Sequence, residues 1–190
     1  MTMEILNYLK IFPRVLYNPT RAFGVLASES ISLTSIFANL GLPFLILGAY
    51  GRVLGEVRLS DPTSLPPIIA NIFVHLLVLC IGIFLGSLML SKLAPRYGVS
   101  VSFSSVTKIS LLSYKPACLT LFISGLGFGG LYLVVVGLLA GLLFFGKGLR
   151  VFADFPPNRL VGFVFMAFLI FLGVMYFSLF LLRNFLALVY

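Results

Sequence analysis

The chain has 190 residues, of which 61% are hydrophobic and only 9% are charged, and its mean hydropathy is +1.16. A soluble domain of this length cannot cover so much apolar surface, so the composition excludes a soluble protein. The formal net charge of +8 does not indicate a nucleic-acid partner, because no polar domain is available to carry a binding face. We expect an integral membrane protein with one membrane domain over residues 1–190.

Two short amphipathic patterns precede the first long apolar stretch. Between residues 4 and 17, apolar residues recur at helical spacing: Ile5, Leu9, Phe12 and Leu16. This stripe predicts a helix that lies in the membrane interface with its cations toward the headgroups. Asn18 as N-cap and Pro19 at the first helical position predict a second short helix over about Pro19–Ser28. We expect residues 1–30 to form these interfacial helices.

The first two membrane spans are predicted from length and apolar character. A hydrocarbon core of about 30 Å requires about 20 apolar residues in a helix. We predict spans over Leu33–Tyr50 and Ile68–Leu90, joined by a polar loop at Arg52–Pro67. In the first span Asn39 stands four residues before Pro43, and the proline predicts a kink because it frees a backbone carbonyl.

The second span carries two features that bear on function. Gly82 and Gly86 have GxxxG spacing, which permits close approach of another helix. His75, about two turns into the span, is the candidate ionisable group at membrane depth. It could relay a proton or face a polar cavity, although a histidine in such a place is more often neutral and hydrogen-bonded to a neighbouring helix.

Residues 91–125 are the hardest part of the chain to place. After a predicted loop at Ser91–Ser105, apolar residues recur every three positions and predict an amphipathic helix: Phe103, Val106, Ile109 and Leu112. This helix runs into Tyr114-Lys115-Pro116, a polar break at which tyrosine and lysine predict anchoring in the interface. Binding of a lipid headgroup or of a partner is the alternative. The apolar stretch Ala117–Ile123 is too short to cross by itself.

The distribution of basic residues favours a third span over Ile109–Ile123, with Lys115 extending back to the headgroups. With the N-terminus in the cytoplasm, this topology places the following basic residues inside: Lys10, Arg14, Arg21, Lys92, Arg96, Lys108, Lys115, Lys147, Arg150 and Arg159. It leaves outside Arg52, Arg58 and Arg183. Without this crossing, the bias that holds basic loops in the cytoplasm weakens. We therefore expect five spans and an external C-terminus.

The last two spans follow a glycine-rich segment. Gly125–Gly130 predicts a tight external turn, and its formal GxGxxG pattern does not predict a phosphate site because no strand precedes it. The fourth span is predicted over Leu126–Gly146 and contains a second GxxxG pair, Gly137 and Gly141. The fifth is predicted over Leu160–Leu182.

Little catalytic chemistry is predicted. All five acidic residues fall outside the expected hydrocarbon region: Glu4, Glu29, Glu56, Asp61 and Asp154. A pair of carboxylates for an intramembrane aspartyl protease is therefore not expected. Ser124 with His75 is the nearest match to a serine–histidine pair, but Ser124 lacks a glycine before it. Cys80 and Cys118 predict neither a disulfide framework nor a metal site. We expect no catalytic residue, cofactor or metal.

Three short motifs, in order and spacing, resemble the prokaryotic branch of the Yip domain family over about residues 5–180. They are Asn18-Pro19-Thr20-Arg21-Ala22-Phe23, Leu93-Ala94-Pro95-Arg96-Tyr97-Gly98 and Ser113-Tyr114-Lys115-Pro116-Ala117. The resemblance implies a five-helix bundle with a cytosolic N-terminus and no catalytic residues. Eukaryotic members are adaptors that bind small GTPases. The short segment before the first span and the missing acidic-Leu-Tyr-Gly-Pro signature argue against a GTPase partner here.

Two hypotheses of function follow. The leading one is a non-enzymatic protein that associates with other helices as an organiser or accessory subunit of a membrane complex, in contact with lipid and with a partner subunit or a second copy. The alternative is a small transporter or channel at an oligomer interface, with its path around His75 and Asn39. The expected location is a prokaryotic cytoplasmic membrane.

Overall fold

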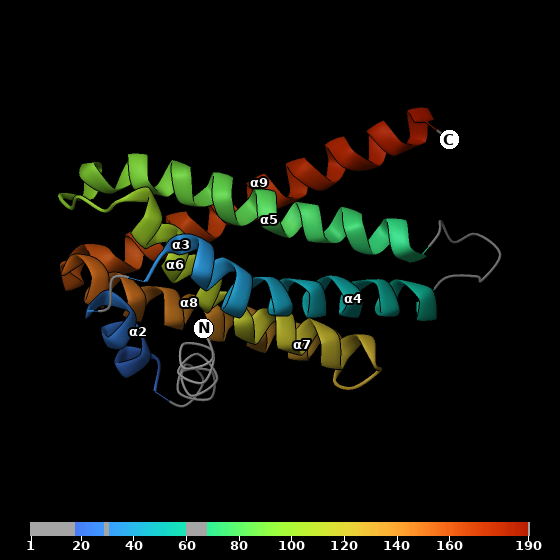
Figure 1. Cartoon of the computed structure of the whole chain (residues 1–190), viewed down its shortest axis with the longest axis horizontal. Helices are drawn as coiled ribbons and strands as arrows, with labels where there is room; N and C mark the ends of the chain where they lie inside the picture. Colours follow the sequence, from blue (N-terminus) through green and yellow to red (C-terminus); the bar gives the residue numbers. More distant parts are fainter. Residues whose placement is uncertain (1–17, 29–30, 60–67, 190) are drawn as a thin grey trace.

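The structure is a computed structural model that describes residues 18–28, 31–59 and 68–189. Within these ranges the chain forms helices and no strands (Figure 1). The helical stretches that are long and apolar enough to cross a membrane number five: Leu33–Arg58, Ile68–Tyr97, Phe103–Gly125, Gly130–Ala153 and Pro157–Asn184. The expected all-α membrane bundle of five spans is confirmed.

Helix α2 (Pro19–Ser28) begins where the sequence predicts it. The Asn18 side-chain oxygen accepts a hydrogen bond from the Arg21 N–H at 3.2 Å, which confirms the N-cap. Its apolar face is buried, and Phe23 packs edge-on against Phe152 of the fourth span with ring centroids 6.3 Å apart. This face therefore contacts the bundle and is not turned toward lipid, as an interfacial helix would require. The predicted helix over residues 4–17 lies outside the described residues.

The first span is irregular near its start and longer than predicted. Helix α3 (Leu33–Ile36) passes into a π-helical turn (Phe37–Gly41) and then into α4 (Leu42–Leu59). The Leu42 N–H donates to the Phe37 carbonyl, five residues back. The wide turn stands directly before Pro43, which has no N–H to continue the regular ladder, so it takes the place of a simple kink. Residues 52–59 are helical, so the predicted loop is wrong there.

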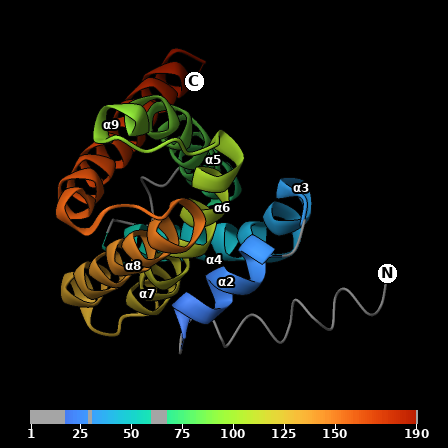
Figure 2. The same cartoon turned by 90° about the vertical axis from the view of Figure 1, so that its left-hand side faces the viewer.

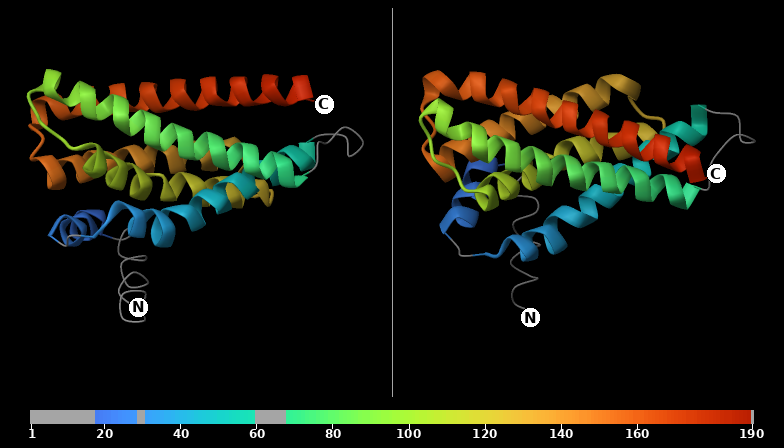
Figure 3. Two further views of the ribbon diagram at one scale, coloured as in Figure 1. Left: turned by 45° about the horizontal axis from the view of Figure 1, so that its top comes forward. Right: turned by 90° about the horizontal axis from the view of Figure 1, so that it is seen from above.

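The second and fifth spans run side by side (Figure 3). Helix α5 (Ile68–Leu93) continues into a 3-10 turn (Ala94–Tyr97) that ends at Gly98 with φ 79°. Helix α9 (Pro157–Val189) begins near that end and packs back along α5. Both predicted spans are confirmed and extended, and the predicted loop after the second span begins only at Gly98.

The third span is broken into two helices and is the most buried of the five. Helix α6 (Phe103–Ser113) and helix α7 (Lys115–Gly125) meet at Tyr114. The predicted amphipathic pattern of α6 does not leave a polar face exposed, since most of its side chains are buried: Val106, Thr107, Ile109, Ser110, Leu111, Leu112 and Ser113.

Hydroxyl groups make this burial possible. Ser110 Oγ donates to the Val106 carbonyl and Ser113 Oγ to the Ile109 carbonyl, at 2.8 and 2.7 Å. A hydroxyl that donates a hydrogen bond to a backbone carbonyl of its own helix is not an unsatisfied donor in an apolar interior. The serines of this helix are therefore compatible with the core.

The turn after α7 has the predicted tight form. Gly127, Gly129 and Gly130 adopt positive φ angles, which cost little only for glycine. Helix α8 (Gly130–Ala153) starts at the end of this turn, later than predicted, and continues beyond Gly146. Asp154, with φ 45°, ends α8 and leads to α9.

The closest helix contact joins α4 to α7 through glycines. A Cβ built on Gly51 would lie 2.6 Å from the Phe122 backbone nitrogen, and one on Gly48 would lie 2.9 Å from Cys118 Sγ. Gly125 faces the Gly51 carbonyl in the same seam. Only glycine permits two helix backbones to approach this closely. Gly51 and Gly55 have GxxxG spacing and are not among the predicted pairs, and of the two only Gly51 is needed for the backbone contact.

Figure 1 shows the two ends of the bundle, and the described basic residues other than Lys115 divide between the elements at these ends. The end at which α5 and α8 finish and α6 and α9 begin holds Arg21, Lys92, Arg96, Lys108, Lys147, Arg150 and Arg159. The opposite end holds Arg52, Arg58 and Arg183. Lys115 belongs to neither end, so it does not contribute to the basic loops as expected.

We predict that Gly51→Ala lowers the free energy of unfolding by about 1–3 kcal/mol, because its methyl group would meet the α7 backbone. Gly173→Ala in α9 is the control, since a Cβ there meets nothing within 4 Å. Thermal unfolding in detergent, followed by circular dichroism, measures the difference. Equal stability of the two variants would contradict the importance of the seam.

Candidate functional site at the break in the third span

The break between α6 and α7 has a covalent cause. The Tyr114 N–H still donates to the Ser110 carbonyl at 3.0 Å, and the Cys118 N–H donates to the Tyr114 carbonyl at 2.9 Å. Pro116 between them has no N–H, so the helical ladder is interrupted within the span. Tyr114, Lys115 and Pro116, which the sequence placed in the interface, therefore lie between the two halves of a membrane span.

Lys115 is buried, with an exposed fraction of 1%. Its Nζ lies over the ring of Phe44 from α4, 5.2 Å from the ring centroid, which is the geometry of a cation–π contact. The predicted extension of this side chain to the headgroups is wrong, because the neighbouring helix covers it. Ionisable groups at membrane depth are costly and mark functional sites by default.

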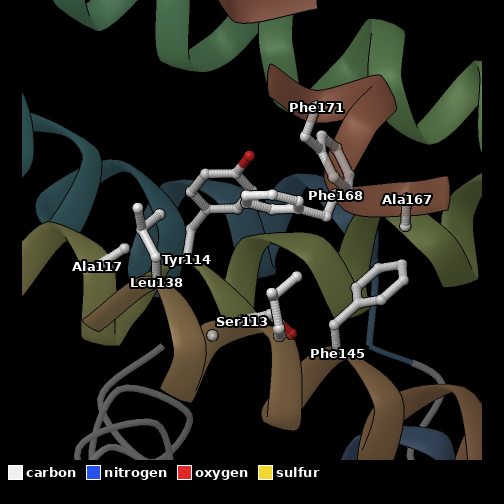
Figure 4. A pocket seen from close by; sticks show the side chains of 10 residues that line it. Ser113, Tyr114, Ala117, Leu138, Phe145, Ala167, Phe168 and Phe171 are labelled. Carbon is white, nitrogen blue, oxygen red and sulfur yellow. The ribbon is translucent and has the colours of Figure 1, made fainter. Parts of the chain in front are cut away.

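A small cavity of about 50 Å³ lies beside this break (Figure 4). Its lining comes from α6, the break and α7 (Ser113, Tyr114, Ala117), from α8 (Leu138, Gly141, Leu142, Phe145) and from α9 (Ala167, Phe168, Phe171). We call it the Tyr114 pocket. Tyr114 stands edge-on to Phe171 with centroids 5.6 Å apart, and its hydroxyl donates to Met175 Sδ at 3.7 Å. The lining is apolar apart from hydroxyl groups that are already bonded within the chain.

The pocket lies where α8 and α9 separate. The two helices are joined by the short segment 154–156 and diverge from there (Figures 1 and 2). Beyond this junction α9 packs along α5, whereas α8 packs along α7. The Tyr114 pocket is thus a recess between the break of the third span, α8 and α9.

Both predicted GxxxG pairs are used inside the chain. A Cβ on Gly82 would lie 2.6 Å from Met175 Cγ, and one on Gly86 would lie 2.5 Å from the Phe171 ring, both on α9. A Cβ on Gly137 would meet Thr120 of α7, and one on Gly141 would lie 2.7 Å from the Ser113 carbonyl. These pairs therefore pack the bundle itself and are not free to bind another protein.

A polar cluster surrounds Glu56 near the end of α4. Its Oε1 lies 3.2 Å from Arg52 Nε, 3.4 Å from Arg183 Nη2 and 3.5 Å from His75 Nε2. Its Oε2 accepts a hydrogen bond from Asn71 Nδ2 at 3.1 Å. The carboxylate was expected in a loop, yet it joins α4 to α5 and α9. His75 Nδ1 donates to the Asn71 carbonyl at 2.9 Å, which fixes the ring within this cluster.

Several residues that the sequence patterns grouped do not meet. Asn39 is exposed and donates to Ser35 Oγ at 3.2 Å. It lies about 25 Å along the first span from Glu56, the partner of His75, so His75 and Asn39 do not line one path. Ser124 Oγ donates to the Gly130 carbonyl at 3.0 Å, whereas His75 faces Glu56, so the two do not form a catalytic pair.

In the described part of the chain, no three His, Cys, Asp or Glu side chains gather to hold a metal ion. Cys80 and Cys118 are free thiols. Comparison of the chain with protein-family models, with curated proteins and with solved structures finds no match.

We predict that Glu56→Gln lowers the free energy of unfolding by about 1–2 kcal/mol, because it weakens the contacts from one carboxylate to three helices. The double-mutant cycle with Arg183→Gln is expected to give a coupling energy of about 0.5–1 kcal/mol, typical of a partly exposed pair. Lys147→Gln, an exposed change at the other end, is the control. Additive effects would show that Arg183 contributes independently of Glu56.

Proposed function

We propose that the protein is a non-enzymatic integral membrane protein of the Yip type, acting as an organiser or accessory subunit of a membrane complex. It binds a transmembrane helix of a partner protein against α8 and α9 at the Tyr114 pocket. The observation that carries this proposal is the Tyr114 pocket, a recess at the break of the central span.

The size of the pocket favours a helix over a small ligand. Sites for small molecules usually measure about 300–1,000 Å³, whereas this pocket measures about 50 Å³. That volume accepts part of one apolar side chain. Helices in a bilayer associate through close packing because lipid tails are as apolar as leucine. A recess of this size suits a single apolar knob from a neighbouring helix.

The charge separation supports an orientation. Basic residues concentrate at the α5–α6 and α8–α9 connections, and such loops are retained in the cytoplasm. We propose a multi-pass protein of a prokaryotic cytoplasmic membrane, with a cytoplasmic N-terminus, an external C-terminus and membrane lipid around it. A small GTPase is not part of this proposal.

Leu138→Trp tests the docking site, since Leu138 lines the pocket and a larger side chain would occlude it. Leu139→Trp is the matched control, because the adjacent side chain is 56% exposed and is not part of the pocket lining. We expect the partner to co-purify with wild type and Leu139→Trp after gentle solubilisation, and to be lost at least about fivefold with Leu138→Trp. Mass spectrometry with isotope labels measures the ratio.

Equal recovery with both variants would contradict docking at this pocket. Recovery of the chain alone as a homo-oligomer would replace the accessory-subunit proposal with self-association.

One observation favours a second candidate, a small transporter at an oligomer interface. Lys115 is a buried cation at a discontinuous span, and half-helix ends at membrane depth form substrate sites in transporters. Under this candidate, Lys115→Met and His75→Ala would abolish transport in reconstituted vesicles. Under the leading proposal, partner binding would survive His75→Ala.

A further inference from the structure

A groove at the opposite end of α7 from the break has a different chemistry. It has a volume of about 530 Å³ and lies between the last turns of α4, the end of α7 and the start of α8. Arg52, Glu56 and Arg58 enter it from α4, with Ser124 and Leu131 on the other side. We call it the Arg58 groove.

The groove is wide because glycines stand where side chains would fill it. Gly55 is the clearest case: a Cβ built there meets only the Cα of Gly125, at 4.0 Å. Unlike Gly51, Gly55 is therefore not needed for backbone contact. Its missing side chain leaves space in the groove.

The charge of the groove is positive. Glu56 is the acidic residue in its lining, and its oxygens are already taken by Arg52, His75, Arg183 and Asn71. Arg58 lies against the Gly127 backbone and has no ion pair within the ranges that the structure describes. As far as the described residues are concerned, the Arg58 guanidinium has donors for a ligand, and the Arg52 guanidinium adds a second positive charge.

The groove lies at the depth of lipid headgroups. The turn from Gly125 to Gly130 closes the third and fourth spans, so its level marks the end of the hydrocarbon region. Leu131, at the groove edge, is 76% exposed, as expected of a side chain that faces acyl chains. No side chain caps the start of α8, so the positive end of its helix dipole is available to an anion in the groove. This contribution supplements the charge of the two arginines.

We propose that the Arg58 groove binds the phosphodiester headgroup of an anionic membrane lipid. Guanidinium groups bind phosphate with paired, charge-assisted hydrogen bonds. The volume falls in the range of small-ligand sites and is about ten times that of the Tyr114 pocket. This site does not depend on the proposed function, because it uses the other end of α7 and the first turn of α8, whereas the Tyr114 pocket is lined by α8 only from Leu138 onward.

Native mass spectrometry of the purified full chain, titrated with phosphatidylglycerol, tests the proposal. Arg52→Gln with Arg58→Gln is expected to weaken binding about tenfold or more. Lys147→Gln with Arg150→Gln removes the same charge from exposed positions at the other end and is expected to change binding less than about twofold. Phosphatidylcholine is expected to bind the wild type more weakly than phosphatidylglycerol does.

Gly55→Leu separates the groove from diffuse charge. It keeps both arginines, fills the space and is expected to weaken phosphatidylglycerol binding as the double arginine variant does. Unfolding temperatures confirm that each variant is folded. Equal losses in both charge variants, or unchanged binding in Gly55→Leu, would overturn the proposal. Displacement of the lipid by millimolar glycerol phosphate would assign the groove to a soluble phosphate instead.

Discussion

The backbone contact between α4 and α7 is the constraint on which the rest of this structure depends. In a bilayer, helices gain nothing from leaving water and must associate through close packing. Gly51 and Gly125 allow the two backbones to meet, with Phe122 against Gly51. This contact places α4 beside the break of the third span, so that Phe44 covers Lys115. Larger residues in place of these glycines would move α4 away from α7 and separate Lys115 from the Phe44 ring.

The central position of the third span explains its composition. A span covered by other helices can hold serine and threonine if each hydroxyl has a partner, and Ser87 Oγ donates to Ser110 Oγ at 3.2 Å between α5 and α6. The same burial makes the break at Tyr114 tolerable, because the interrupted backbone is covered by protein and not by lipid. The Tyr114 pocket follows from the break and from the divergence of α8 and α9.

The two sites divide the molecule by depth and chemistry. The Tyr114 pocket is small and apolar, beside a break within a membrane span, and suits packing against a helix. The Arg58 groove is about ten times larger, positive and level with headgroups. The Glu56 carboxylate offsets part of the positive charge at that end of the bundle and joins α4, α5 and α9 there. Because Glu56 is occupied in this way, it does not pair with Arg58, which has no ion pair among the described residues.

The sequence alone determined the fold class, the existence of five spans, the Asn18 cap and the glycine turn, because apolar length, proline and glycine act locally. Only the tertiary structure decided that Lys115 is buried and that Glu56 faces His75, since both depend on which helices become neighbours. The pattern of Phe103–Ser113 predicted an amphipathic helix but not its burial, because a serine can bond either to water or to the backbone of its own helix, and the spacing of residues does not show which. The GxxxG pairs marked close contacts correctly, but their partners lie within the chain, and that depends on how the helices are arranged.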